Sequence, residues 1–183
     1  MASYHAKYDP TYDHIISWIE GCNYGLYKDT VVQHCLVFLK QFSGFTCSRK
    51  IVQFGMTPHI YLLWLNGTVP IKYESKDFNI PINVVLPENF PHSGPKVLIG
   101  FPLDEKSAAD NPLVKNGNQV MNNYIHKWKG NDVQFNLGGL WQNLSKSFSI
   151  YPPIGKPGGG ISKTDVIYIE NDDSRPKPKN LVK

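Results

Sequence analysis

The residue types that could do covalent or metal chemistry are few, and the thiols lie near the start of the chain. Cys22, Cys35 and Cys47 are the candidates for a nucleophile or for zinc ligands. They form no C-x-x-C pair, and no histidine stands at a spacing typical of a zinc site. We therefore predict no metal, no cofactor and free thiols in a reducing compartment, with Cys35 buried in helix packing.

The segment KNGNQVMNNYIHKWK, residues 115–129, looks built around a special position but contains no obvious reactive group. Its Asn116-Gly117 pair is a strong turn signal. His126 and Trp128 stand two residues apart, so they could belong to a site or could anchor a loop through a buried side chain. We favour the anchor, because tryptophan buries a large apolar area.

Composition limits the classes of function. The 183 residues are 41% hydrophobic, which is enough for one domain with a core. The net charge is +4, but the basic residues are scattered, so nucleic-acid binding is not predicted. No stretch approaches the roughly 18 apolar residues of a transmembrane segment, and the N-terminus lacks a signal peptide. The chain reads as cytoplasmic.

Two helices are predicted at the start of the chain. The first has Asp9 as its N-cap, Pro10 in its first turn, and Gly21 after its end. Its apolar residues at helical spacing are Tyr12, Ile15, Ile16 and Ile19. The second has Asp29 as its N-cap and ends before Gly44. Its apolar face consists of Val32, Cys35, Leu36, Leu39 and Phe42.

From residue 50 the period changes to that of strands. The runs KIVQF, HIYLLWL, TVPIKY, FNIPINVVL and KVLIGF are short, apolar and separated by turn formers, which predicts a four-stranded antiparallel meander. Asn66-Gly67 between two runs is a hairpin signal, so we expect a turn there. Pro70 and Pro81 lie inside strand-like runs, where proline is tolerated at an edge or a bulge.

The last part of the chain is predicted as a long loop, a helix and a tail. Residues 102–136 show no sustained period and are rich in asparagine, and a loop of this length is commonly functional. The next helix has Leu137, Leu140, Trp141, Leu144 and Phe148 on one face. Residues 156–183 read as a linker and charged tail, although Val166–Ile169 could pair with an exposed strand edge. The order of elements predicts an α+β class.

These blocks carry a family resemblance. NGTVPIKYESKDFNIPINVVLPENFPHSGPKVLI, followed by an Asn-Gly loop and a late tryptophan, resembles the core of the ubiquitin-conjugating fold. LNGTVPIKY, FNIPI, YIHKWK and YPPI are similar to the ubiquitin-conjugating enzyme variant (UEV) domain of ESCRT-I. The resemblance implies a UEV domain over residues 1–155, with two N-terminal helices, the meander, one helix after a long loop, and no further pair of C-terminal helices.

The resemblance also implies that catalysis is absent. Conjugation needs a thiolate that forms a thioester. The position of that cysteine falls near Met121, whose thioether has no proton to lose. No cysteine follows Cys47, and the family's His-Pro-Asn motif is missing from DNPLVKNGN. The chain is therefore expected to be an inactive variant and not an enzyme.

With catalysis excluded, the resemblance points to recognition of Pro-Thr/Ser-Ala-Pro-type peptides. Such peptides are already extended, and aromatic walls accept their proline rings. The matching positions are Thr68, Tyr73, Phe78, Asn79, Ile80 and Pro81 on one wall, with Pro153 and Ile154 on the other. One departure is Gly155, which stands where the family has an aromatic residue.

Ubiquitin is the second partner that the resemblance implies. The family holds it with the hairpin between the first two strands, here residues 53–59, and with a patch on neighbouring strands. The positions carried over are Gln53, Gly55, Met56, Val85 and Leu98. Val85, Leu98 and Gly100 replace larger family residues.

Together these features predict a non-catalytic module of ESCRT-I type that sorts ubiquitinated cargo in multivesicular-body transport, in the cytoplasm and peripheral to the endosomal membrane. Other ESCRT subunits would be partners if the chain belongs to a longer protein. Two alternatives remain: a UEV that pairs through its first helix with an active conjugating enzyme in polyubiquitin assembly, and a structural homologue with neither ligand.

Overall fold

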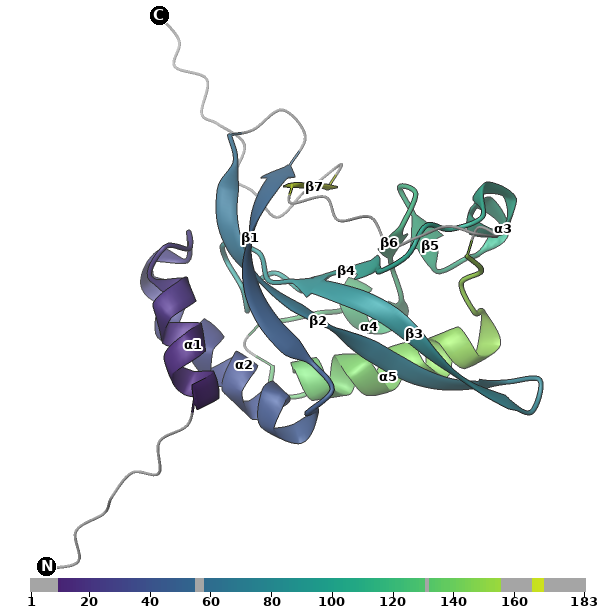
Figure 1. The fold of residues 1–183 in the computed structure, drawn as a ribbon, viewed down its shortest axis with the longest axis horizontal. Coiled ribbons are helices and arrows are strands. Elements are labelled where there is room, and N and C mark those ends of the chain that lie inside the picture. The colour runs from purple at the N-terminus through teal and green to yellow at the C-terminus, as the bar shows by residue number, and fades with distance from the viewer. Residues whose placement is uncertain (1–9, 55–57, 131, 156–165, 170–183) are drawn as a thin grey trace, which may run out of the picture.

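The structure, a computed structural model, describes residues 10–54, 58–130, 132–155 and 166–169. Its main helices lie along one side of a twisted, mostly antiparallel sheet (Figure 1). The predicted α+β class is confirmed. No helix among the described residues is long and apolar enough to cross a bilayer.

The first helices form as predicted, with one correction. α1 (Pro10–Ile19) buries Ile15 and Ile19, and its predicted cap Asp9 lies outside the described residues. A short 3-10 helix η1 (Gly25–Tyr27) leads directly into α2 (Lys28–Gln41). The prediction of Asp29 as N-cap is wrong, because the N-cap Tyr27 is already helical in φ and ψ and Asp29 lies inside the first turn. There its charge favours the helix dipole without capping it.

Four antiparallel strands form the predicted meander. They are β1 (Thr46–Phe54), β2 (Ile60–Tyr73), β3 (Lys76–Val85) and β4 (Lys96–Ile99). β1 pairs with β2, β2 with β3, and β3 with β4, and each ladder is continuous. In the first pair Thr46 lies opposite Asn66, and in the last pair Ile82 lies opposite Ile99. Helix α5 (Leu137–Ile150) packs its buried leucines and Phe148 against one face of this sheet.

The predicted hairpin turn at Asn66-Gly67 is wrong, because β2 continues straight through it. The chain reverses instead at Glu74 and Ser75, which have φ angles of 48° and 64°. The Ser48 hydroxyl donates a hydrogen bond to the Asn66 side-chain oxygen at 3.2 Å, and the Asn66 side-chain amide donates to the Asn83 side-chain oxygen at 2.9 Å. Both bonds hold Asn66 in the sheet. Turn-forming residues are thus used here for side-chain pairing and close packing.

The ring of Phe45 packs so closely on residue 67 that only glycine fits there. A Cβ atom at residue 67 would lie 2.5 Å from Cγ of Phe45, whose ring is buried against the strand. We expect Gly67→Ala to lower the free energy of unfolding by about 1–3 kcal/mol through overpacking, measured by urea denaturation. Gly44→Ala is the control, since nothing lies within 4 Å of a Cβ there. Equal effects of the two substitutions would contradict the packing role of Gly67.

Both strand prolines lie where a ladder hydrogen bond is absent, as predicted. The β1 ladder ends opposite Asn66, so β2 is a free edge at Pro70, whose carbonyl accepts a hydrogen bond from Ser145 of α5 at 2.6 Å. Pro81 lies one residue beyond the β3–β4 register, and its carbonyl accepts from the Gly100 N–H at 2.9 Å.

Residues 102–136 are more regular than predicted. They contain α3 (Glu105–Asp110), β5 (Val114–Lys115), β6 (Gln119–Val120) and α4 (Asn123–His126). Asn116 and Gly117, with φ angles of 47° and 83°, make the turn between β5 and β6. Asn122 and Asn136 cap the helices that follow them. These three asparagines are therefore turn and cap residues, and the elements between them are too short to show a helical or strand period in the sequence.

The apolar island of the tail forms β7 (Val166–Ile169), which pairs in parallel with Ile51–Phe54 of β1. The alternative of edge pairing is the one that the structure supports for these four residues. The other residues of 156–183 lie outside the described part of the chain.

Ending the chain after Gly160 removes β7. We expect the melting temperature to fall by roughly 2–4 °C, the shift that about 1 kcal/mol produces in a domain of this size, measured by differential scanning calorimetry. Ending the chain after Glu170 retains β7 and is the matched control. Two equal melting temperatures would mean that β7 adds nothing to the stability of the fold.

Candidate functional site

Met121, the position expected for a lost catalytic thiol, lies directly after β6. The side chain is half-buried, and its sulfur lies 3.8 Å from the Gln119 amide nitrogen. It lines an open surface cleft of about 650 Å³, together with Tyr124, His126 and Tyr151 among others. No cysteine lines this cleft. The side chains present offer apolar and hydrogen-bonding contacts but no thioester chemistry.

His126 and Trp128 do not form a site together. His126 is exposed, whereas Trp128 is 9% exposed and its indole N–H donates to the Pro91 carbonyl at 2.7 Å. Tyr124 packs edge-on against Trp128, and its hydroxyl donates to the carbonyls of Gln134 and Asn136. Burial raises the pKa of Tyr124. These residues anchor the segment, as the favoured interpretation predicts.

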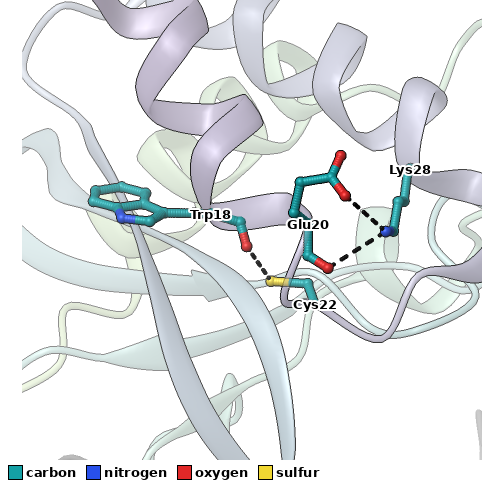
Figure 2. Close-up of polar contacts among 4 residues, drawn as sticks. All are labelled: Trp18, Glu20, Cys22 and Lys28. Carbon is teal, nitrogen blue, oxygen red and sulfur yellow. Dashed lines mark hydrogen bonds and ion pairs between the residues drawn. The ribbon is translucent and has the colours of Figure 1, made fainter.

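The thiols near the N-terminus are packed away from the cleft. Figure 2 shows the Cys22 thiol directed at the Trp18 carbonyl, to which it donates at 3.3 Å. Nearby, Lys28 bridges two oxygens of Glu20, its carboxylate at 3.7 Å and its backbone carbonyl at 3.5 Å. Burial raises the pKa of Cys22 to about 12. This thiol therefore stays protonated and unreactive near neutral pH.

Cys35 is fully buried, which agrees with its predicted packing role. A hydrogen bond with the Cys47 thiol, together with burial, raises the pKa of Cys35 well above its usual range. Within the described residues no group of three or more His, Cys, Asp or Glu side chains could hold a metal ion.

Two aromatic rings mark the end of the β2–β3 hairpin. Tyr73 is 36% and Phe78 is 44% exposed. Phe78 lies opposite Ile71, and Tyr73 lies two residues beyond Ile71 on β2. Because opposed residues and residues two apart share a face, both rings lie on the side of the sheet that α5 covers. They extend its apolar surface past the end of the helix.

The remaining predicted contacts on this wall are divided between the two faces. Ile80 shares the face of Phe78 but is buried, with 7% exposure. Strand alternation places Thr68, Asn79 and Pro81 on the opposite face. The side chains of these three residues therefore do not line one surface with Tyr73 and Phe78, and the peptide wall itself stays a prediction.

The second predicted wall follows α5. Ile154 is 56% exposed, whereas Pro153 is buried. The Asp104 N–H donates to the Ile154 carbonyl at 2.9 Å, and Gly155 forms a bridge with Leu103. Just before this segment, in the last turn of α5, Ser149 Oγ accepts a hydrogen bond from the Lys72 N–H at 3.4 Å. These bonds hold the segment after α5 between the hairpin and the start of α3.

Phe101 is a residue that the sequence analysis did not select. It follows β4, is half-buried, and packs against the core. Its only sequence signal is an aromatic residue at the end of the run KVLIGF. Its contact with Gly155 is visible only in three dimensions.

The predicted ubiquitin contacts are only partly at the surface. Gln53 is half-buried, and its side-chain oxygen lies 2.8 Å from Nε2 of His59 at the base of the hairpin. Gly55 and Met56 lie outside the described residues. Val85 and Leu98 are 0% and 4% exposed, which corrects their assignment as surface contacts, because a buried side chain cannot touch a partner.

A four-stranded meander with helices along one face defines a protein of the ubiquitin-conjugating fold class. Residues 22–156 match the family model of the UEV domain, and the chain belongs to that family. UEV domains are catalytically inactive variants of the conjugating fold.

Known relatives agree with this assignment. Human tumor susceptibility gene 101 protein is 29% identical over 93 residues, which is 51% of this chain and 23% of that protein. The chain thus matches about a quarter of that relative's length. Two solved structures share the fold at 16% identity and a TM-score of 0.58. They are the yeast vps23 UEV domain in complex with a vps27 PSDP peptide, and a complex of the Vps23 UEV with ubiquitin. The first match covers 79% of this chain and 96% of that one, and the second 81% and 100%.

Proposed function

We propose that this chain is a non-catalytic module that binds proline-rich peptides of the Pro-Thr/Ser-Ala-Pro type and ubiquitin. The observation that carries the proposal is the exposure of Tyr73 and Phe78 on one face at the hairpin end. The peptide and ubiquitin in the solved complexes of the related fold support it.

The peptide would lie between the two rings and the segment that contains Ile154. A polyproline-type segment is extended before it binds, so it loses little conformational entropy. The rings accept proline through apolar contact, and the exposed Ile154 side chain adds apolar surface from the segment after α5. Weak affinity is expected, because few side chains contribute.

Ubiquitin would contact the hairpin of residues 53–59 more than the strands. Val85 and Leu98 are buried, so the proposed surface is reduced to the base of this hairpin, where the bond between Gln53 and His59 fixes the two strands. We place the module in ESCRT-I-type sorting of ubiquitinated cargo, cytoplasmic and peripheral to the endosomal membrane, with other ESCRT subunits as partners.

The test is a pair of separate titrations of the isotopically labelled protein, one with a Pro-Thr-Ala-Pro peptide and one with ubiquitin. The peptide is expected to shift the amide signals of Tyr73, Phe78 and Ile154. Phe78→Ala is expected to weaken peptide binding about tenfold or more. Tyr61→Ala is the matched control, since Tyr61 is an exposed ring at the other end of β2, with 43% exposure.

The outcomes separate the two ligands. No shift with the peptide would remove the peptide half of the proposal, and no shift of ubiquitin's apolar patch would remove the ubiquitin half. Co-purification with an active conjugating enzyme, without binding of either ligand, would favour a UEV that assists polyubiquitin assembly.

A further inference from the structure

The position of Gly155 is determined by a neighbouring ring. A Cβ atom at residue 155 would lie 3.1 Å and 3.2 Å from Cδ2 and Cε2 of Phe101. These distances are tighter than nine in ten real Cβ contacts. The φ angle of Gly155 is not in the left-handed region, in contrast to Gly117. The Phe101 ring, and not the backbone conformation, crowds residue 155, so a side chain there would require the ring to shift by a few tenths of an ångström.

Phe101 is held at this place by the sheet. The preceding residue, Gly100, donates its N–H to the Pro81 carbonyl at 2.9 Å. On the other side, the bridge between Leu103 and Gly155 keeps the two chain segments together. The ring is half-buried, so one side packs on the core while part of it remains accessible beside exposed Ile154.

The spacing to the hairpin rings suits an extended peptide. Gly100 lies opposite Pro81, so the next residue, Phe101, lies beside Ile80. Ile80 is two residues from Phe78 along β3, which is roughly 7 Å at about 3.3 Å per residue, and the two residues share a face. Two aromatic walls at about this separation can enclose a single extended chain.

We propose that Phe101 is a specificity-determining residue of the peptide site. Its ring, from the segment directly after β4, provides the aromatic surface beside Ile154 where residue 155 has no side chain, and selects a proline at that point of the peptide. This inference rests on the proposed peptide-binding function. It assigns the aromatic ring of the site to residue 101 without changing the chemical class of the ligand.

The test compares three variants by calorimetric titration with a Pro-Thr-Ala-Pro peptide and with a Pro-Thr-Ala-Ala peptide. Phe101→Leu keeps apolar volume but removes the ring, and is expected to weaken binding of the first peptide about fivefold to tenfold. The preference for the terminal proline should fall by a similar factor. Tyr73→Ala removes a ring from the hairpin side of the peptide site, and its affinity for the peptide measures the contribution of that side. The double variant Phe101→Ala with Gly155→Phe returns a ring from the opposite segment and is expected to recover most of the lost affinity.

The outcomes distinguish this inference from the function on which it rests. If the unaltered chain does not bind the peptide, the proposed function and the inference both fail. If it binds and Tyr73→Ala weakens binding, but Phe101→Leu changes affinity and preference less than twofold, the role of Phe101 alone is overturned. An unchanged melting temperature and an unchanged ubiquitin titration for Phe101→Leu show that its fold is intact.

Discussion

Replacing Trp128 by alanine is expected to lower the free energy of unfolding by about 3–5 kcal/mol, the usual cost of removing a buried large aromatic ring. The Trp128 ring packs within 5.8 Å of Phe90 and 5.9 Å of Tyr124 and Phe135, measured between ring centroids. Its N–H donates to the Pro91 carbonyl at 2.7 Å. The loss removes both the packing and the bond that join residues 123–135 to the segment after β3.

Urea denaturation of two further variants separates these contributions. Trp128→Phe keeps a ring but loses the N–H donor, so a smaller loss of about 1–3 kcal/mol is expected from the unpaired carbonyl. Trp18→Ala removes a half-buried indole from α1 and is the matched control. If Trp128→Ala costs no more than Trp18→Ala, Trp128 is not the anchor of its segment.

Tyr24→Phe is expected to lower the free energy of unfolding by about 2–4 kcal/mol although it deletes one oxygen atom. The Tyr24 hydroxyl donates to the Leu86 carbonyl at 2.9 Å and accepts from the Leu63 N–H at 2.8 Å. The ring is 1% exposed, and burial raises the pKa of Tyr24 well above its usual range, so the donor proton is retained. The substitution leaves two buried backbone groups unpaired, each of which costs about 1–3 kcal/mol.

Tyr61→Phe removes the same atom from an exposed ring and should change stability by less than about 0.5 kcal/mol. Hydrogen exchange of the Leu63 amide provides a local measurement. Faster exchange at Leu63 in Tyr24→Phe is expected, and equal stability of the two variants would show that water replaces the lost hydroxyl.

The helices and the strands of the meander could be predicted from the sequence because their signals are local. Residues 28–41 and 137–150 repeat apolar side chains at helical spacing, and they form helices in the structure. The two Asn-Gly pairs show that a local signal can fail to predict a turn. Asn116-Gly117 makes a turn, whereas Asn66-Gly67 continues a strand, because the Phe45 ring and the partners Ser48 and Asn83 hold it there. These contacts come from other parts of the chain.

The candidate site depended still more on tertiary structure. Sequence blocks selected Tyr73 and Phe78, but the strand register decides that Thr68, Asn79 and Pro81 lie on the other face. Burial decides that Val85 and Leu98 are unavailable to a partner. Phe101 gave almost no sequence signal, since its contact is with a glycine far along the chain.

The sequence by itself determined the absence of any cysteine after Cys47, the positions of the main helices and the UEV resemblance. Covalent composition does not depend on folding, and periodicity depends only on near neighbours. Tertiary structure alone decided which side chains share a face, which ring fills the space beside Gly155, and which turn signals make turns. These properties depend on packing between segments distant in sequence, because close-packed interiors leave each position only the space that its neighbours do not fill.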